Sequence, residues 1–344
     1  MSTESQSGAS VTTDQPGPTK DHKKGGRVRT ASSEGRWASM LVAPSLIMLA
    51  IVIVYPVTTA VFTSFQKDSG LDKVTGLFVA GGSAGFSNYT HWILQKCTTT
   101  GGGTMPCPPG TLGSQFWSSM GTTFFFTVVT VVLETLIGFW MAVIMSRAFR
   151  GRGLLRAAVL VPWAIPTAVT AKLFFFIFAF QGIVNKLFGT TILWTGSEWP
   201  ALWGIIVADV WKTTPFMALL ILAGLQIIPW DVYEAAKVDG VTVWQRFVHI
   251  TLPLVRPALM VAILFRTLDA LRMYDLPAIM TDGANNTTTL SILVVHQIRA
   301  GFNSAAALSS ITFLTIFMVA FIFVRFLGVN AVETTTAIKK GTAK

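Results

Sequence analysis

Six stretches of the chain are each long and apolar enough to cross a lipid bilayer, and this feature limits the possible folds more than any other. A spanning helix needs about 20 mostly apolar residues. Charged residues make up only 12% of the chain, against about 25% in a soluble domain, so the chain cannot cover a water-facing surface. The sequence therefore predicts an all-α polytopic membrane protein with six transmembrane helices, at 40–65, 117–146, 155–180, 200–226, 257–280 and 305–327.

The distribution of lysine and arginine predicts the orientation of these spans, because cytoplasmic loops carry an excess of both. With the N-terminus inside, the four cytoplasmic pieces hold 15 of these residues and the three outer loops hold 5. The bias is firmest at Arg147, Arg150, Arg152 and Arg156, around one short loop. We expect a multi-pass protein of the plasma membrane with both termini in the cytoplasm. The net charge of +10 is assigned to topology rather than to binding of nucleic acid.

The rest of the chain is arranged around a transmembrane domain at 37–328. Residues 1–36 and 329–344 contain few large apolar side chains and are predicted to be disordered cytoplasmic tails. An outer loop at 66–116 is long and rich in glycine, and a polar cytoplasmic loop occupies 229–256.

The outer loop contains the two cysteines of the chain, Cys97 and Cys107. Outside the cell a disulfide between them is permitted; otherwise they are two free thiols in a mobile loop. Metal binding is not expected, because His91 is the only neighbouring imidazole and the ligand spacing is wrong.

Motifs for nucleotide binding and covalent catalysis are absent from the sequence. The nearest glycine cluster, at 151–153, lacks the lysine and Ser/Thr of a phosphate-binding loop. There is no nucleophile elbow and no HExxH pair, and the four histidines fall on four different segments. We therefore expect no catalytic residues, metal or cofactor in this chain.

The cytoplasmic loop at 229–256 is predicted to form a helix, a glycine corner and a second helix. Asp231 followed by Glu234 has the form of a helix N-terminus. Gly240 can end that helix in the left-handed conformation. Thr242 with Gln245 repeats the capping pattern, and Pro253 is expected to close the second helix.

Each of these short helices has an apolar face. Val232, Tyr233 and Ala236 form the first, while Val243, Trp244, Phe247 and Val248 form the second. Large apolar groups on a short polar loop are either buried by a partner protein or packed beneath the ends of the chain's own helices. Spacing alone does not decide between these two interpretations.

The same loop resembles a known family. Glu234-Ala235-Ala236-x-x-Asp239-Gly240, followed by Phe247-x-x-Ile250-x-Leu252-Pro253-x-x-x-Pro257, is similar to the EAA loop of bacterial ABC importer permeases over 24 positions. Val241 stands where the family usually has alanine. The resemblance implies a type I ABC importer permease fold. It also implies that 234–240 form a coupling helix, with Trp244 and Phe247 beside it, that docks on a separate ATPase subunit binding ATP and Mg.

The resemblance extends over most of 36–328. Segment 210–226 is similar to the fourth span of sugar-type permeases, and 265–275 with 280–283 to the first permease of maltose- and trehalose-type importers, nearest to those of mycobacteria and their actinobacterial relatives. It implies a second homologous permease, two ATPase subunits, an extracellular sugar-binding lipoprotein and a sugar substrate, namely a disaccharide such as trehalose or maltose.

Charges within the predicted spans are expected to have partners, because a charge at the bilayer centre costs at least about 2.5–3.5 kcal/mol. Asp209 and Lys212 can pair along one helix, and Arg266, Asp269 and Arg272 stack on one face. Glu134 and Lys172 stand alone in their spans, which favours pairing between helices.

Two interpretations of this polar face stay open. Either it lines a sugar path or its ion pairs only fasten one helix to the next. The candidate path residues are Trp211, Lys212, Thr213, Arg272, Tyr274, Asp275, Asn285 and Asn286. Pro162 and Pro166 are expected to interrupt the third span and Pro215 the fourth, as in spans that line a cavity.

The sequence thus predicts a transport permease that works by alternating access. Two other functions would each explain only part of the sequence. An ion-coupled secondary carrier would explain the buried charges but not the capped cytoplasmic loop. A polytopic membrane enzyme would need an acidic catalytic cluster on a soluble face, which the sequence lacks.

Overall fold

The computed structural model describes residues 31–71, 76–98 and 103–325. Two compact units divide the chain after Pro56. The first contains α1 (Ala31–Leu49) and a π-helical turn, η1 (Ala50–Val54), and α2 (Tyr55–Ser64) begins at its end. Because α1 starts at Ala31, the prediction that the disordered tail reaches residue 36 is wrong for its last six residues. The remainder of that tail and the tail at 329–344 lie outside the described residues.

The second unit opens with small elements between α2 and the helical bundle. They are β1 (Gln66–Lys67), β2 (Gly70–Leu71), β3 (Phe78–Val79), β4 (Gly82–Ser83), α3 (Ser87–Ile93), β5 (Lys96–Thr98), β6 (Thr104–Pro106) and the 3₁₀ turn η2 (Leu112–Gln115). The strands pair antiparallel as β1–β4, β2–β3 and β5–β6, with Gln66 opposite Ser83, Gly70 opposite Val79 and Cys97 opposite Met105.

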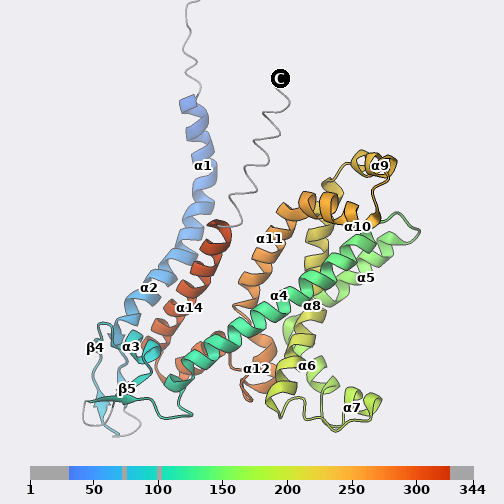
Figure 1. The fold of residues 1–344 in the computed structure, drawn as a ribbon. Helices are drawn as coiled ribbons and strands as arrows, with labels where there is room; N and C mark the ends of the chain where they lie inside the picture. Colours follow the sequence, from blue (N-terminus) through green and yellow to red (C-terminus); the bar gives the residue numbers. More distant parts are fainter. Residues whose placement is uncertain (1–30, 72–75, 99–102, 326–344) are drawn as a thin grey trace, which may run out of the picture. The chain divides into compact units, whose positions relative to one another are not determined.

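The bundle itself is helical (Figure 1). Its elements are α4 (Phe116–Ser146), α5 (Arg152–Ala164), α6 (Thr167–Ile177), α7 (Ile183–Phe188), α8 (Glu198–Ile227), α9 (Trp230–Val238), α10 (Val243–Arg246), the π-helical turn η3 (Phe247–Thr251), α11 (Leu252–Ala270), α12 (Asp275–Thr281), α13 (Leu290–Ala300) and α14 (Phe302–Phe323). The α4–α5 turn and α9 lie towards one end of the bundle, and α7 and α12 lie towards the other.

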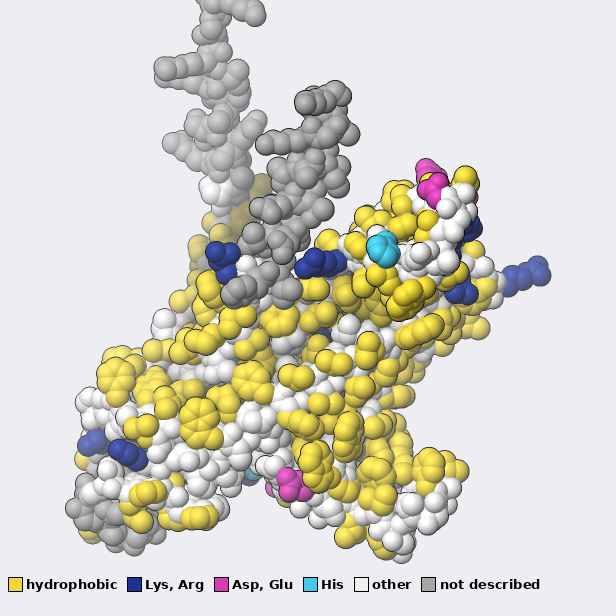
Figure 2. Space-filling view, viewed as in Figure 1, with side chains coloured by type: hydrophobic (Ala, Val, Ile, Leu, Met, Phe, Trp, Pro, Cys, Tyr) yellow, Lys and Arg dark blue, Asp and Glu magenta, His cyan; other side chains and the backbone are white. Residues whose placement is uncertain are grey.

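Five helices among the described residues are long and apolar enough to cross a membrane, and a bent pair makes a sixth. They are Ser39–Ser64, Leu112–Ser146, Glu198–Ile227, Val243–Ala270 and Phe302–Phe323, with Arg152–Ala164 and Thr167–Ile177 as the pair. The expected all-α polytopic fold is therefore confirmed. Figure 2 shows apolar side chains over most of the visible face of the helices, as a lipid environment requires.

The fifth span differs from its prediction at 257–280. The helix runs continuously from Val243 to Ala270 and then breaks before α12, because charged residues at 269–275 interrupt the apolar run. Pro253 does not close a helix. It lies in the first turn of α11, directly after the π-helical turn η3, where the altered hydrogen bonding accommodates a residue without an N–H.

The prolines of the third and fourth spans have different effects. The third span bends by 87° between α5 and α6, next to Pro162 and Pro166, as predicted. Pro215 does not interrupt the fourth span, since α8 continues through it. In the same turns, the hydroxyls of Thr213 and Thr214 donate to the carbonyls of Asp209 and Val210 (both 2.6 Å), and such side chains stabilise a proline-containing helix.

Packing of α8 against α4 and α11 forms the centre of the bundle. Gly224 of α8 permits the close approach of α11, because a Cβ there would lie 2.4 Å from the Cβ of Ala258. Small residues have this role between membrane helices in general. A second cluster joins α3, α4, α13 and α14 around the fully buried Trp92, whose indole N–H donates to the carbonyl of Ser304 (3.0 Å).

Asp68, between β1 and β2, caps α14 from a distant part of the sequence. Its carboxylate accepts from the backbone N–H of Asn303 (2.6 Å) and of Ser304 (3.3 Å). These N–H groups belong to the first turn of α14, where the helix itself provides no acceptor.

Replacement of Asp68 by alanine should lower stability by about 1 kcal/mol, the usual effect of losing a helix cap. Thermal unfolding of the detergent-purified chain measures it, with Ser69→Ala as the control. Equal unfolding temperatures for Asp68→Ala and the wild type would show that the contact does not stabilise α14.

Candidate functional site

The break between α5 and α6 leaves backbone carbonyls without helical partners, and Lys212 of α8 binds two of them. Its Nζ donates to the carbonyls of Ile165 (2.6 Å) and Trp163 (3.4 Å). Lys212 therefore does not form the expected ion pair with Asp209. Its charge instead lies at the C-terminal end of α5, where a helix dipole favours a cation.

Arg266 of α11 is the centre of a buried ionic cluster. It binds Glu134 of α4 through Nε and Nη2, Asp209 of α8 through Nη2, and Asp269 through Nη1 (3.0 Å). Thr213 Oγ1 also lies 2.6 Å from Glu134 Oε1. Arg266 and Glu134 are 2% and 0% exposed. The cluster joins three helices, so the interpretation of these charges as fasteners between helices describes Arg266 and Glu134.

A polar cavity lies beside this cluster. The break of the fifth span, between α11 and α12, forms part of the cavity wall. It has a volume of about 130 Å³ and is lined by Thr167, Asp209, Lys212, Thr213, Arg266, Asp269, Arg272, Met273, Tyr274, Asp275 and Leu276. Because α12 packs on α6, the breaks of the third and fifth spans face the same space. Non-helical backbone at membrane depth is tolerated where it lines such a cavity.

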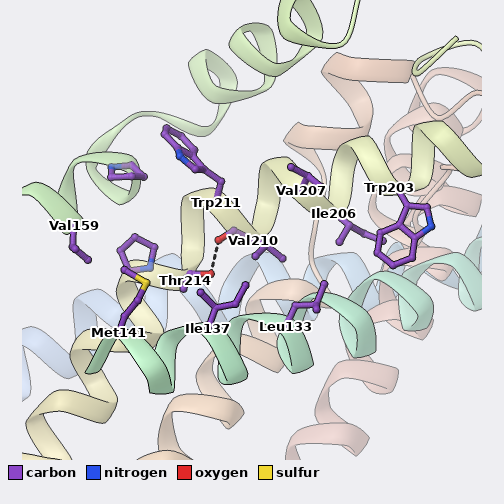
Figure 3. A pocket seen from close by; sticks show the side chains of 12 residues that line it. Leu133, Ile137, Met141, Val159, Trp203, Ile206, Val207, Val210, Trp211 and Thr214 are labelled. Carbon is purple, nitrogen blue, oxygen red and sulfur yellow. Dashed lines mark hydrogen bonds between the residues drawn. The ribbon is translucent and has the colours of Figure 1, made fainter. Parts of the chain in front are cut away.

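The structure brings five of the predicted path residues to this cavity, namely Lys212, Thr213, Arg272, Tyr274 and Asp275. Trp211 lies elsewhere, on an apolar groove of about 480 Å³ between α4, α5 and α8 (Figure 3). Asn285 and Asn286 have φ of 55° and 60° and donate to the Thr195 carbonyl and Glu198 Oε1 (both 2.9 Å). These two side chains hold a loop in place and do not line the cavity.

Sequence reasoning missed Thr167 and Met273 as cavity residues. Thr167 follows Pro166 at the start of α6, so a polar residue directly after the proline pair was the available signal. Met273 lies in the break between α11 and α12. Its position could not be inferred, because the predicted fifth span ran through that break.

Replacement of Lys212 by methionine should reduce transport and lower stability by about 1–3 kcal/mol, because two partly buried carbonyls lose their donor. Lys172→Met is the matched control: Lys172 is exposed on α6, with Nζ 5.6 Å from the centre of the Phe175 ring. Sugar uptake and the unfolding temperature should both be lower for Lys212→Met than for Lys172→Met. If both behave alike, Lys212 does not stabilise the break.

At one end of the bundle, the loop at 229–256 forms the predicted helix, glycine corner and helix. Gly240 has φ of 70°. Its N–H donates to the carbonyl of Lys237 (3.2 Å), and that of Val241 donates to Ala236 (3.0 Å), which is the Schellman arrangement. Thr242 and Gln245 form a reciprocal capping box. The first cap differs from its prediction: Pro229 is the N-cap of α9 and Asp231 lies within the first turn, with no side-chain capping bond from the N-cap residue.

Some side chains of this loop are packed against the rest of the protein, and others are exposed on its surface. Ala236 is buried, and the Tyr233 hydroxyl lies 3.2 Å from that of Thr251, connecting α9 to η3. Glu234, Ala235 and Asp239 are exposed.

The aromatic pair of the loop divides in the same way. Phe247 packs edge-on against Phe139 of α4 (centroids 5.5 Å apart), so it tucks beneath the chain's own helices. Trp244 stacks on Phe247 (5.6 Å) yet remains 71% exposed. Packing beneath the chain's own helices thus describes Phe247 and leaves Trp244 exposed.

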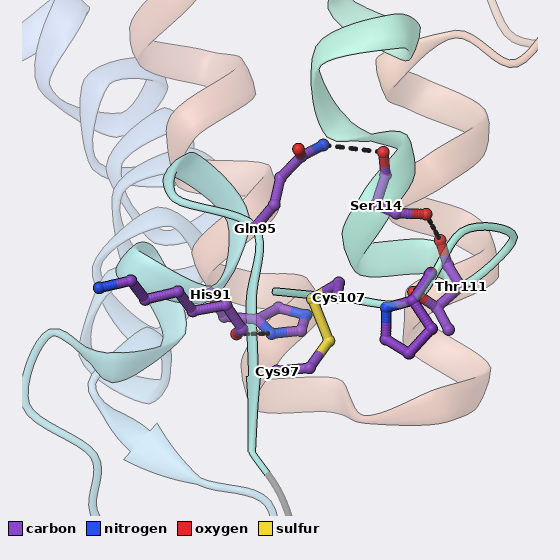
Figure 4. Close-up of a disulfide and its surroundings, with 8 residues drawn as sticks. His91, Gln95, Cys97, Cys107, Thr111 and Ser114 are labelled. Carbon is purple, nitrogen blue, oxygen red and sulfur yellow. Dashed lines mark hydrogen bonds between the residues drawn. A yellow bond between two sulfur atoms is a disulfide. The ribbon is translucent and has the colours of Figure 1, made fainter. Parts of the chain in front are cut away.

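A disulfide joins Cys97 of β5 to Cys107 next to β6 (Figure 4). His91 lies beside it, with Nδ1 2.8 Å from the carbonyl of Lys96. The potential ligand atoms of His91 and both cysteines lie within 4.8 Å of one another. Because both sulfurs are bonded to each other, they provide no thiolate for a metal.

A bundle of apolar helices with a polar cavity at two broken spans is typical of a membrane transport protein. The chain matches the family model of the binding-protein-dependent transport system inner membrane component over residues 134–336, and it belongs to this family. It is a permease subunit of an ABC importer, which transports and does not catalyse a reaction. The ion-coupled carrier and the membrane enzyme are therefore not favoured.

Individual relatives agree with this assignment. The trehalose transport system permease protein SugA of Mycobacterium tuberculosis is 34% identical over 308 residues, covering 89% of this chain and 93% of the relative. The trehalose/maltose transport system permease protein MalF of Thermococcus litoralis is 34% identical over 304 residues, covering 85% and 94%. The resemblance seen in the sequence is thus confirmed.

A solved structure shares the fold. It is the crystal structure of a bacterial ABC transporter involved in the import of the acidic polysaccharide alginate, with a TM-score of 0.66, 17% identity, and coverage of 85% of this chain and 94% of that chain. The type I importer permease fold expected from the sequence is accordingly confirmed.

Proposed function

We propose that this chain is the first permease of an ATP-driven disaccharide importer, with trehalose or maltose as substrate. The observation that carries the proposal is the polar cavity at the breaks of two spans. The names of the relatives support the substrate class. Sugar hydroxyls both donate and accept hydrogen bonds, and Lys212, Arg272, Tyr274 and Asp275 offer groups of both kinds.

The size of the cavity supports a path shared with a second chain. Its 130 Å³ is small beside the roughly 300–1,000 Å³ of ordinary small-molecule sites, so it does not enclose a disaccharide by itself. This chain therefore provides one wall of the path, and a homologous second permease provides the other. No covalent step takes place in the permease.

Two ATPase subunits, which bind ATP and Mg, complete the proposed importer together with an extracellular sugar-binding lipoprotein. The exposed Glu234, Ala235 and Asp239 with Trp244 form the docking surface for one ATPase, and the rigid corner at Gly240 transmits its movement to α8 and α11. In this arrangement both termini are cytoplasmic, and the disulfide-bonded loop at 66–116 faces the binding lipoprotein.

Co-purification from mild detergent tests the assembly, and uptake tests the substrate. The tagged chain should bring down a second permease and an ATPase with measurable ATP hydrolysis. Cells lacking the chain should lose uptake of radiolabelled trehalose or maltose and regain it on complementation. A chain that purifies alone and inert would contradict the assembly; unchanged uptake of both sugars would contradict the substrate.

A further inference from the structure

The apolar groove between α4, α5 and α8 is long and too narrow for a helix. Leu133, Ile137 and Met141 of α4 recur every four residues and so line one face. On α8 the groove extends from Trp203 to Pro215, about 18 Å at 1.5 Å per residue. The free space between its atoms is about 960 Å³, whereas 18 Å of a helix about 10 Å wide occupies roughly 1,400 Å³. The body of a helix does not fit into it.

An arginine, Arg156, lies near one end of the groove. Met141 of α4 and Val159 of α5 lie at that end (Figure 3). Arg156 precedes Val159 by about one helical turn, and its Nη2 donates to the carbonyl of Met145 (2.8 Å), about one turn beyond Met141. Two helices therefore place the Arg156 guanidinium just past the end of the groove.

The arginines around this end have no anionic partner within the described part of the chain. None of Arg147, Arg150, Arg152 and Arg156 forms an ion pair with a described carboxylate within 4.0 Å. The first three are exposed, and Nε of Arg156 is buried without an acceptor. Figure 2 shows dark blue side chains at this end of the bundle. An apolar groove that ends in unpaired guanidinium groups is complementary to an amphiphile with an anionic head.

We propose that the groove binds one acyl chain of an anionic phospholipid, whose phosphate is held by Arg156 together with Arg150 and Arg152. The loop at 147–151 connects two spanning segments, so it belongs at a surface of the bilayer, where lipid phosphates lie. Guanidinium groups bind phosphate through paired N–H donors, and basic pockets between membrane helices recognise anionic head groups. The positive charge of the arginines favours this occupant. Neither a neutral lipid nor an apolar side chain of another subunit would provide a negative charge to pair with them.

Native mass spectrometry of the purified importer complex tests the site. The probes are phosphatidylglycerol and phosphatidylcholine with identical acyl chains. The wild-type complex should retain phosphatidylglycerol in preference to phosphatidylcholine. Arg156→Gln should weaken its binding about fivefold, while Arg325→Gln, which removes an exposed arginine at the end of α14, should not. Ile137→Trp, which fills the groove without a change of charge, should also release the lipid.

The alternatives give different results. Equal retention of both lipids, or binding that is unaffected by both Arg156→Gln and Ile137→Trp, would overturn the proposal. So would full-yield cross-linking of the Ile137→Cys variant, labelled with a short thiol-reactive photo-cross-linker, to another subunit, because that result would place protein in the groove.

Discussion

Replacement of Arg266 by methionine is expected to destabilise the protein by about 3–5 kcal/mol, the usual effect of removing one partner from a buried ion pair. Glu134 and Asp209, which are 0% and 4% exposed, would then face each other without a cation. Thermal unfolding in detergent should report a large loss, and little folded chain should be recovered from the membrane.

A neutral cluster provides the decisive comparison. Arg266→Met combined with Glu134→Gln and Asp209→Asn removes both the cation and the two carboxylates, so most of the lost stability should return. Arg272→Met is the matched single control: Arg272 is exposed, and its loss should change stability by at most about 0.5 kcal/mol. If Arg266→Met is as stable as the wild type, the buried carboxylates do not depend on this cation.

Replacement of Gly240 by proline is expected to abolish transport while membrane insertion remains intact. Proline fixes φ near −65°, but Gly240 has φ of 70°. Its N–H, which proline lacks, also donates to the carbonyl of Lys237. The corner between α9 and α10 would therefore change direction, and the proposed docking surface for the ATPase would be lost.

A graded series at the same position separates backbone geometry from side-chain size. Asparagine tolerates the left-handed conformation, whereas alanine is strained there by about 1–2 kcal/mol. Uptake and co-purification of the ATPase should thus decrease in the order Gly, Asn, Ala, Pro. The space around a Cβ at Gly240 is open, so contact within the chain does not explain such an order. Normal uptake by Gly240→Pro would exclude a coupling role for this loop.

Local features of the fold could be predicted because each depends on a few neighbouring residues. The Thr242–Gln245 capping box joins residues three apart, and the corner at Gly240 follows from the properties of glycine. The error at Pro253 was also local in origin, since a π-helical turn ahead of it removed the conflict that normally ends a helix.

The candidate site was predicted only in part. Lys212, Arg272, Tyr274 and Asp275 were recognisable as polar groups in an apolar context, and they line one cavity. Asn285 and Asn286 had the same polarity, yet they hold the loop that follows α12. Polarity identifies residues that need partners, but it does not identify those partners.

By itself, the sequence determined that the chain spans a membrane, where most spans begin and end, and which family it resembles. These properties depend on hydropathy and motif spacing along a continuous stretch of chain. Tertiary structure alone decided that Arg266 binds Glu134, 132 residues away, that Asp68 caps α14 and that Lys212 binds the carbonyls at a break. Such contacts depend on which helix faces meet, because a buried charge pairs with whatever group the packing places beside it.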